Sequence, residues 1–268
     1  MKILITGATD GIGLEAAKLF VQKQELGIEL LIHGRSLEKL EAARNLLLSL
    51  NPQANVSVYQ ADLSSMSATK EFAKSVLHSH SHLDVLINNA GILKTSDTLT
   101  EDGFDVRFAV NTFAPLVLTH GLLPIIKNNG RIVNLSSAAQ TPIDESLLCG
   151  RSQTSNAMQA YAQSKLAITM WSRALADQLA QSGPTVITLN PGSLLASKMV
   201  KQGFGIAGND MSIGAEIIVR SALDETFALK SGQYFDNDIG DFGPPHVDAQ
   251  DKDACVKLYQ LLKDMLID

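Results

Sequence analysis

Short apolar segments alternate with longer amphipathic segments along the whole chain. The apolar segments have the length and composition of strands, and they are Lys2–Thr6, Ile28–His33, Asn55–Gln60, Leu83–Asn88, Arg131–Leu135, Thr185–Leu189 and Gln233–Phe235. Several are nearly all apolar, as expected of parallel strands covered on both faces. The predicted helices between and after them are Gly11–Gln24, Leu37–Leu50, Ala68–His80, Phe104–Lys127, Ala157–Gln181, Ile213–Leu229 and Ala249–Leu266. This alternation predicts an α/β fold with one doubly wound parallel sheet of about seven strands and helices on both faces.

Length and composition narrow the class of protein further. The 268 residues contain no linker or repeat, so we expect a single domain over residues 1–268. The net charge of -6 gives no reason to expect a nucleic-acid partner. No apolar run is expected to reach the roughly 20 residues that span a bilayer, and the first residues lack the features of a signal peptide. Because Cys149 and Cys255 cannot form a disulfide framework, we expect a soluble cytoplasmic protein without a membrane partner.

A glycine-rich turn follows the first predicted strand directly. It reads Gly7-Ala8-Thr9-Asp10-Gly11-Ile12-Gly13 and leads into a predicted helix. Glycines let the backbone approach a pyrophosphate, and the start of a helix offers free N–H groups and the positive end of its dipole. The spacing, T-G-x-x-x-G-I-G, differs from the common G-x-G-x-x-G fingerprint. The position between the first strand and the first helix nevertheless predicts a nucleotide site.

The end of the second predicted strand bears on which nucleotide binds. It reads His33-Gly34-Arg35-Ser36, without the carboxylate that would bind a ribose diol and favour NAD. Arg35 is suited to grip a 2′-phosphate, which favours NADP, although an exposed arginine at a helix start would give the same pattern. Asp10 argues the other way, because it adds negative charge beside the same pocket. NADP(H) is therefore favoured, and NAD(H) stays open.

Tyr161 and Lys165 place a phenol and an ammonium on one face of a predicted helix. A nearby cation would lower the tyrosine pKa and make Tyr161 a general acid and base. Tyr259 and Lys263 have the same spacing, which we interpret as a surface feature of the last helix. The spacing alone is therefore weak evidence, and the surroundings must distinguish the two pairs.

The surroundings favour Tyr161, rather than Tyr259, as the general acid and base. Polar residues end three neighbouring strands at the edge of the sheet where Tyr161 is expected, and these ends are Asn88-Asn89-Ala90-Gly91, Asn134-Leu135-Ser136-Ser137 and Asn190-Pro191-Gly192. Asn111 lies in an otherwise apolar helical stretch, so it needs a buried partner or a role.

In chain order these motifs resemble those of the short-chain dehydrogenase/reductase family over essentially the full length of the chain. Asp62-Leu63 resembles the family's adenine-contacting pair, and Asn111, Ser137, Tyr161 and Lys165 fall on its catalytic tetrad, with Ser137 fitting better than Ser136. The cofactor-binding residues predicted from the turn and the resemblance are Thr6, Gly7, Thr9, Asp10, Gly11, Ile12, Gly13, Arg35, Asp62, Leu63, Asn89, Ala90, Gly91, Tyr161, Lys165, Pro191 and Gly192. The family's threonine after Pro-Gly is replaced by Ala196, followed by Ser197.

The long gap between Ser137 and Tyr161 and the late segment Ser231–Phe235 resemble the retinol-dehydrogenase-like branch of that family. Members of this branch often carry an N-terminal membrane anchor. Because this chain starts on its first strand, we do not carry retinoid or membrane-lipid chemistry over to it.

The resemblance implies hydride transfer between a nicotinamide and the carbon of a carbonyl or of a primary or secondary alcohol. Tyr161 would protonate the carbonyl oxygen, and Ser137 would stabilise its developing charge. Lys165 would lower the pKa of Tyr161 and hold the nicotinamide ribose, and Asn111 would position a water of a proton relay. The alternatives are an NAD-dependent alcohol dehydrogenase of the same fold and a non-catalytic regulator that binds NADP.

Two irregular stretches, 138–156 and 193–210, are the expected substrate-side loops. They hold Ile143, Leu147, Leu148, Leu194, Leu195, Met199, Phe204 and Ile206, which favours a small to medium-sized apolar substrate. The alternative is that these side chains pack the loops down. We interpret His78, His80 and His82 as a solvated surface run, so no metal site is expected. Many members of the family form homodimers or homotetramers, but nothing in the sequence establishes either state.

Overall fold

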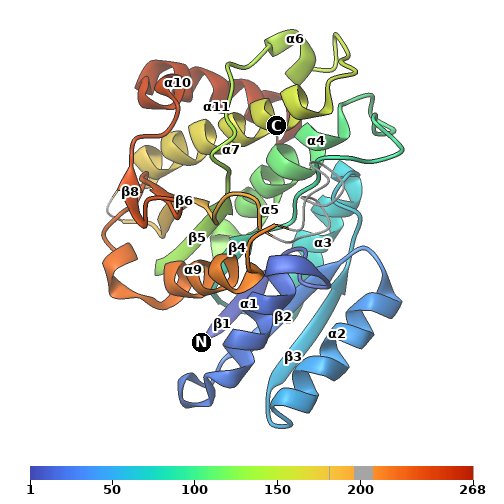
Figure 1. The fold of residues 1–268 in the computed structure, drawn as a ribbon, viewed down its shortest axis with the longest axis vertical. Coiled ribbons are helices and arrows are strands. Elements are labelled where there is room, and N and C mark those ends of the chain that lie inside the picture. Colours follow the sequence, from blue (N-terminus) through green and yellow to red (C-terminus); the bar gives the residue numbers. More distant parts are fainter. Residues whose placement is uncertain (181, 196–207, 268) are drawn as a thin grey trace.

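A computed structural model describes residues 1–180, 182–195 and 208–267 (Figure 1). Its centre is one eight-stranded sheet in the order β3-β2-β1-β4-β5-β6-β7-β8. The strands are β1 (Lys2–Ile5), β2 (Glu29–Gly34), β3 (Asn55–Gln60), β4 (Leu83–Asn88), β5 (Ile126–Leu135), β6 (Thr185–Asn190), β7 (Tyr234–Asp236) and β8 (Asp241–Gly243). Every pairing is parallel except that of β7 with β8. The chain reverses direction across the sheet between β1 and β4, as in a doubly wound fold.

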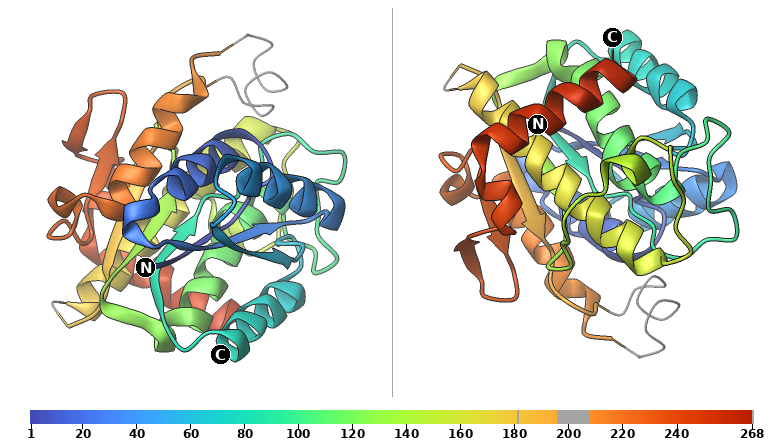
Figure 2. Two further views of the ribbon diagram at one scale, coloured as in Figure 1. Left: turned by 90° about the horizontal axis from the view of Figure 1, so that it is seen from below. Right: turned by 90° about the horizontal axis from the view of Figure 1, so that it is seen from above.

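Helices cover both faces of this sheet (Figures 1 and 2). The longer ones are α1 (Gly11–Gln22), α2 (Leu37–Leu50), α3 (Met66–Ser79), α5 (Ala114–Leu122), α7 (Ala157–Leu179), α9 (Met211–Leu223) and α11 (Lys252–Leu266). Helices α1, α2 and α9 cover one face, and α3, α5, α7 and α11 cover the other. Short helical segments join them, and these are α4 (Val106–Phe108), α6 (Glu145–Leu148), α10 (Val247–Gln250) and the 3-10 turns 24–26, 123–125 and 225–227.

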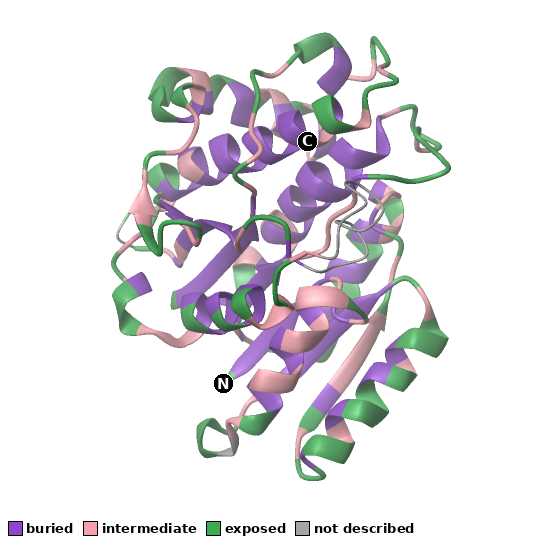
Figure 3. Ribbon diagram, viewed as in Figure 1, coloured by how far each residue is buried: buried purple, intermediate pink, exposed green. Residues whose placement is uncertain are grey.

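The apolar core forms two layers, one on each face of the sheet. Ile3 and Ile5 of β1 belong to the layer under α1 and α9, whereas Leu4 belongs to the layer under α5 and α7. This division follows from the alternation of side chains along a strand. Burial on both faces explains why central strands such as β1 and β2 are mostly apolar (Figure 3).

The predicted helix Phe104–Lys127 is interrupted. The chain forms α4, then a π-helical turn over Ala109–Phe113, then α5, and it enters β5 at Ile126. Pro124 lies in the 3-10 turn before β5, and a proline cannot continue the hydrogen bonds of a helix. Strand β5 is accordingly longer than the predicted Arg131–Leu135. Within the described residues, the stretch Val106–Ile125 is the one long and apolar enough to cross a bilayer, contrary to our expectation, and most of it is buried inside the fold.

Strand β8 is missing from the prediction. Its three residues carry no strand pattern, and they pair with β7 because a tight turn reverses the chain at 237–240. Phe242 then packs edge-on against Phe235 of β7, with ring centroids 5.1 Å apart. The hairpin of β7 and β8 therefore closes one edge of the sheet, next to β6.

Candidate active site

A cavity of about 740 Å³ lies at the carboxyl ends of the parallel strands. All the predicted cofactor-binding residues except Thr6 line it, and so do Ser137, Tyr161 and Lys165. The cavity is therefore bounded by the segments that follow β1, β2, β3, β4, β5 and β6 and by α7. It is the place where open α/β sheets bind ligands.

The glycine-rich turn lets the chain pass close to the turn after β4. Gly7 has φ +66°, and a Cβ atom there would lie 2.9 Å from the Cα atom of Ala90. A Cβ atom on Gly13 would lie 2.4 Å from both the Asn89 side-chain nitrogen and the Gly7 carbonyl oxygen. Both positions therefore require glycine. The Asp10 carboxylate accepts the Gly11 N–H at 2.9 Å and caps α1, whose first residues face the cavity. This arrangement of N–H groups fits the pyrophosphate of a dinucleotide.

Thr6, one of the predicted cofactor-binding residues, lies beneath this turn and does not line the cavity. Its side chain is 1% exposed, and its Oγ1 accepts the N–H groups of Asn89 and Ala90, each at 3.0 Å. The Asn89 side chain in turn donates to the carbonyl oxygens of Thr6 and Gly7 at 2.8 and 3.1 Å. Thr6 and Asn89 thus join the turns after β1 and β4 into one surface of the cavity.

His33 supports the same turn from β2. Its Nδ1 accepts the Gly7 N–H at 3.3 Å, its Nε2 lies 3.1 Å from the Ala61 carbonyl oxygen, and its ring stacks on Phe72 at 4.8 Å. This pattern requires the neutral ring with the proton on Nε2. Burial lowers the pKa of His33 to about 4, and the carbonyl of Ala61 and the charge of Asp62 offset only part of that effect.

The histidine predicts a pH dependence of stability. Its unfolded pKa is 6.5 and its folded pKa about 4, so the unfolded chain binds the extra proton first as the pH falls. The free energy of unfolding should therefore decrease by about 3 kcal/mol between pH 6.5 and pH 4 from this residue alone. Urea denaturation at several pH values gives the free energy of unfolding of the wild type and of His33→Asn. The difference between their slopes against pH is the contribution of His33. If the free energy of unfolding of the two proteins changed equally with pH between pH 6.5 and pH 4, the lowered pKa of His33 would be contradicted.

Arg35, Ser36 and Lys39 line the end of the cavity beyond β2. Ser36 caps α2 by accepting the Lys39 N–H at 3.3 Å, so Arg35 lies just before the helix and Lys39 in its first turn, and both line the cavity. The sequence prediction included Arg35 and missed Lys39, although the sequence shows this second cation in the first turn of the helix predicted over Leu37–Leu50. Asp62 and Leu63 border the same region, after β3.

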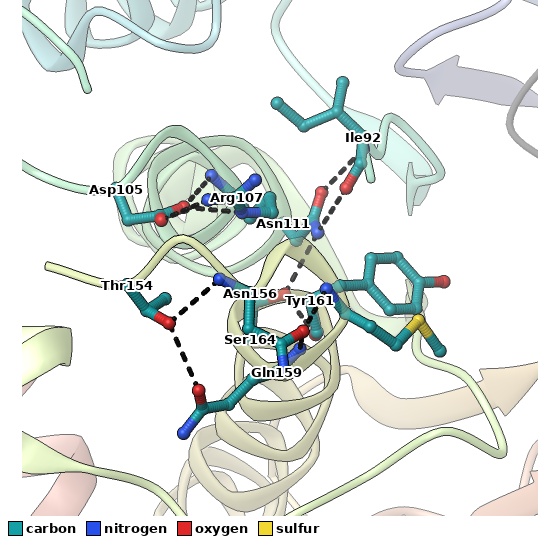
Figure 4. Close-up of polar contacts among 10 residues, drawn as sticks. Ile92, Asp105, Arg107, Asn111, Thr154, Asn156, Gln159, Tyr161 and Ser164 are labelled. Carbon is teal, nitrogen blue, oxygen red and sulfur yellow. Dashed lines mark hydrogen bonds and ion pairs between the residues drawn. The ribbon is translucent and has the colours of Figure 1, made fainter. Parts of the chain in front are cut away.

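Tyr161 and Lys165 lie on successive turns of α7. Asn156 caps this helix by accepting the N–H groups of Met158 and Gln159, both at 3.1 Å (Figure 4). The Lys165 ammonium lies 5.7 Å from the centroid of the Tyr161 ring and donates to the Leu135 carbonyl oxygen at 2.7 Å. Strand β5 and helix α7 therefore place both side chains at the cavity.

The expected lowering of the Tyr161 pKa is wrong for the protein in this state. Burial raises the pKa of Tyr161, and a hydrogen bond with the Ser137 side chain offsets this only in part. Burial also lowers the pKa of Lys165 to about 7, so the lysine carries only part of a charge at neutral pH. The lysine is bound to a backbone carbonyl rather than to the phenol oxygen. In this state Tyr161 is a protonated phenol, which is the form that a proton donor needs.

Burying Lys165 also has a cost in stability. Its pKa falls from 10.5 to about 7, so protonation below pH 7 opposes folding and stability should rise from pH 7 toward pH 10.5. We expect Lys165→Met to raise the free energy of unfolding at pH 7 by on the order of 2 kcal/mol and to remove this pH dependence. Chemical denaturation measures both, with Lys263→Met as the matched control. A less stable Lys165→Met protein would show that the bond to Leu135 outweighs the cost of burial.

Asn111 has a structural partner on each side. It lies in the π-helical turn 109–113, a deviation that is frequent at functional sites. Its side chain accepts the Ile92 N–H at 2.8 Å and donates to the Ile92 carbonyl at 3.0 Å and to the Ser164 hydroxyl at 3.0 Å (Figure 4). Ser164 donates in turn to the Tyr161 carbonyl at 2.6 Å. Asn111 is fully buried and does not line the cavity, so it links the segment after β4 to the backbone of Tyr161.

The two serines after β5 have different surroundings. Ser136 is buried, and its hydroxyl lies 2.9 Å from the Lys165 carbonyl oxygen and 2.8 Å from the Thr169 hydroxyl. Ser137 is half-buried, accepts the Ala139 N–H at 3.1 Å and hydrogen-bonds the Tyr161 side chain. The structure therefore brings Ser137, rather than Ser136, to Tyr161, as the sequence prediction has it.

The second Tyr–Lys pair is not a surface feature, which corrects our interpretation of it. Tyr259 is 4% exposed and its hydroxyl lies 2.9 Å from His120 Nε2. The Lys263 ammonium lies 5.5 Å from its ring centroid, nearly the distance found for Lys165 and Tyr161. The aromatic ring is buried because α11 packs against α7. Neither Tyr259 nor Lys263 lines the cavity, so the surroundings alone distinguish the two pairs.

The first expected substrate-side loop, 138–156, contributes less to the cavity than predicted, and the second is described only in part. Leu147 and Leu148 are buried in the core and Ile143 packs against it, so the residues of 138–156 that line the cavity are Ala138 and Ala139. Leu194 and Leu195 of 193–210 do line it, whereas Ala196, Ser197, Met199, Phe204 and Ile206 lie outside the described residues. The prediction missed further apolar lining from other segments, namely Ile92, Leu93, Val110 and Met158. These residues lie after β4 or on helices, where the sequence shows only a core pattern.

The histidine run is solvated only in part. His78 is exposed and the His82 side chain is 43% exposed. His80 instead lies between Tyr59 and Lys2, with contacts of 2.7 and 2.9 Å, which corrects its interpretation as a surface residue. Across residues 1–180, 182–195 and 208–267, no group of three or more His, Cys, Asp or Glu side chains is arranged to hold a metal ion.

Comparison with known proteins identifies the class. The family model of the short chain dehydrogenases matches residues 1–204. Human retinol dehydrogenase 13 is 33% identical over 87% of this chain and 75% of its own length, and human retinol dehydrogenase 11 is 33% identical over 87% and 76%. A crystal structure of an uncharacterised protein from Mycobacterium paratuberculosis superposes with a TM-score of 0.80, at 28% identity, over 99% of this chain and 92% of that one. A short-chain dehydrogenase from Burkholderia cenocepacia in complex with NADP gives a TM-score of 0.67, at 26% identity, over 87% and 94%.

The chain belongs to the short-chain dehydrogenase/reductase family. It is an oxidoreductase that acts on CH–OH or C=O groups with a nicotinamide cofactor. Within the family it resembles the retinol dehydrogenases.

Proposed function

We propose that this protein is an NADP-dependent oxidoreductase for a small to medium-sized apolar carbonyl compound or the corresponding alcohol. The observation that carries the proposal is the single cavity that Arg35 and Lys39 border at one end and Ser137, Tyr161 and Lys165 at the other. Arg35 follows β2 and Ser137 follows β5, and β1 and β4 lie between these two strands in the sheet, so the cavity extends across about three strand spacings of about 4.8 Å each. That span suits an extended dinucleotide with a substrate beyond its nicotinamide.

Tyr161, Ser137 and Lys165 each have a separate role in the proposed reaction. A bound nicotinamide would supply the hydride that reduces the carbonyl carbon. Tyr161 donates its phenolic proton to the carbonyl oxygen as that carbon is reduced, so no free alkoxide forms. The Ser137 hydroxyl donates a hydrogen bond to the same oxygen and stabilises its negative charge. When Lys165 is protonated, it stabilises the phenolate that Tyr161 leaves behind.

Two observations support NADP over NAD. Arg35 and Lys39 put two cations at the end of the cavity beyond β2, where a 2′-phosphate is recognised in this fold. Asp10 also lines the cavity, and its carboxylate accepts the Gly11 N–H at the start of α1, which gives it a structural role as a helix cap. Among similar solved structures, the dehydrogenase from Burkholderia cenocepacia is a complex with NADP.

The apolar lining near Tyr161 supports an apolar substrate. Leu93, Val110, Met158 and Leu194 border the cavity, and Met158 lies one helical turn before Tyr161. Such side chains bind through the hydrophobic effect and leave orientation to the hydroxyls of Ser137 and Tyr161. Action in the cytoplasm, without a membrane partner, stays a prediction, and so does a homodimer or homotetramer.

A substrate panel tests the proposal. Aliphatic, aromatic and terpenoid aldehydes and ketones are offered with NADPH or NADH, and the matching alcohols with NADP or NAD, while the absorbance of the reduced nicotinamide is followed. We expect turnover of apolar carbonyl compounds and a higher kcat/KM with NADPH. Tight NADPH binding without oxidation by any member of the panel would favour a non-catalytic regulator instead, and a higher kcat/KM with NADH would overturn the cofactor preference.

A further inference from the structure

The hairpin of β7 and β8 holds the turn that follows β6. Strand β7 pairs in parallel with β6, and Asp236 lies opposite Asn190. The residues after Asp236 therefore reach the turn 190–195, every residue of which lines the cavity. This hairpin lies beyond residues 1–204, which the family model matches.

Asp238 makes the densest set of contacts in this region. Its Oδ1 accepts the Ser193 N–H at 2.7 Å, and its Oδ2 accepts the Ser193 hydroxyl at 2.5 Å and the Asn190 side-chain nitrogen at 2.9 Å. The Asn237 side chain adds a bond to the Pro191 carbonyl at 3.0 Å. Three donors on one carboxylate fix the position of both ends of the Pro191–Gly192 turn.

Leu194, the residue after Ser193, has an unfavourable backbone conformation. Its φ of +55° lies in the left-handed region, which residues with a side chain rarely adopt. Asn209 donates to the carbonyls of Leu194 and Ser193 at 2.7 and 3.1 Å. Asp238 holds Ser193 from the other side. Such a conformation persists where the surroundings over-determine it, and it is concentrated at functional sites.

From these contacts we infer that Asp238 is a positioning residue for the cofactor and substrate, which acts through the turn 190–195. It keeps the Pro191–Gly192 backbone and the Leu194 side chain against the cavity before any ligand binds. Without it, the turn would relax from the left-handed conformation at Leu194, and binding would have to order it again. The inference rests on the proposed function, because it takes this turn as the nicotinamide side of the cofactor site.

Asp238→Ala is the test, and Asp241→Ala on the same hairpin is the matched control. Asp238 is exposed, so its loss should leave the fold intact, and Asp241 contacts only the N–H of Phe242 among the described residues. In the protein without cofactor, we expect amide hydrogen exchange over residues 190–195 to become about tenfold faster in Asp238→Ala and to stay unchanged in the control. The dissociation constant for NADPH should rise by about tenfold in the same variant alone.

A double-mutant cycle separates positioning from a general loss of stability. Ser193→Ala should raise the dissociation constant for NADPH in the wild-type background and have little further effect in Asp238→Ala, because the two residues act through one contact. Additive effects of the two substitutions on the dissociation constant would overturn this inference and leave the proposed function standing. Unchanged hydrogen exchange and NADPH binding in Asp238→Ala would do the same. A wild-type protein that binds neither NADPH nor NADH would overturn the proposed function and this inference with it.

Discussion

Replacing Tyr161 by phenylalanine is expected to lower kcat by about 10²–10⁴-fold, the contribution of a positioned general acid. The phenylalanine ring keeps the shape of the cavity beside Lys165 but has no proton to donate to the carbonyl oxygen. Because the raised pKa of Tyr161 keeps its hydroxyl protonated near neutral pH, the loss of this hydroxyl should affect kcat far more than the KM for the cofactor. Steady-state kinetics with a substrate identified from the panel measures both constants.

Tyr259→Phe is the matched control for this experiment. Tyr259 has the same spacing to a lysine and nearly the same distance from ring to ammonium, but its hydroxyl bonds His120 in the core. We expect kcat to stay within about twofold of the wild-type value, since the change is remote from the cavity. Equal kcat values for Tyr161→Phe and the wild type would show that Tyr161 is not the proton donor.

The second large effect concerns the choice of cofactor. Arg35→Ala combined with Lys39→Ala should reduce the ratio of kcat/KM for NADPH to that for NADH by about 10²–10⁴-fold, because each charged hydrogen bond to a phosphate is worth about 1.5–3 kcal/mol and two are lost. The loss should come from a higher KM for NADPH, with activity toward NADH nearly unchanged.

Arg44→Ala provides the control for the cofactor experiment. Arg44 lies on the same helix, half-exposed and 3.6 Å from Glu41, and it does not line the cavity. Its replacement should leave the preference between the two cofactors unchanged. A double variant of Arg35 and Lys39 with the wild-type preference would mean that the 2′-phosphate is recognised elsewhere.

The parts of the fold that depend on local pattern could be predicted from the sequence. The apolar strands and amphipathic helices define the parallel sheet. Two of the three glycines after β1, Gly7 and Gly13, lie where a Cβ atom would collide with Ala90 and Asn89. Because parallel strands end at one edge, residues as distant as Arg35, Ser137 and Pro191 could be assigned to one site.

The remainder depends on contacts between distant segments. Thr6 lies on the glycine-rich motif, but its direction is set by the N–H groups of Asn89 and Ala90. The raised pKa of Tyr161 follows from burial, which the spacing to Lys165 does not reveal. Strand β8 exists because its partner β7 and the aromatic cluster around Phe242 hold it, and its own three residues carry no strand pattern.

The prediction of the residues that line the substrate part of the cavity is limited in the same way. Leu147 and Leu148 have the composition of a substrate loop and instead pack into the core, whereas Met158 reaches the cavity from the first turn of α7. Periodicity assigns an apolar residue to a buried face, and only the packing of the helices decides whether that face borders the core or a cavity.

Transfer of deuterium tests the central claim most directly. NADPH in which both hydrogens of the reactive carbon are replaced by deuterium is incubated with the protein and an apolar aldehyde, and the alcohol formed is analysed by mass spectrometry. The account predicts one deuterium atom per molecule of alcohol with the wild type, and at least about a hundredfold less product with Tyr161→Phe in the same time. An alcohol formed without the label, or formed at equal rates by both proteins, would contradict it.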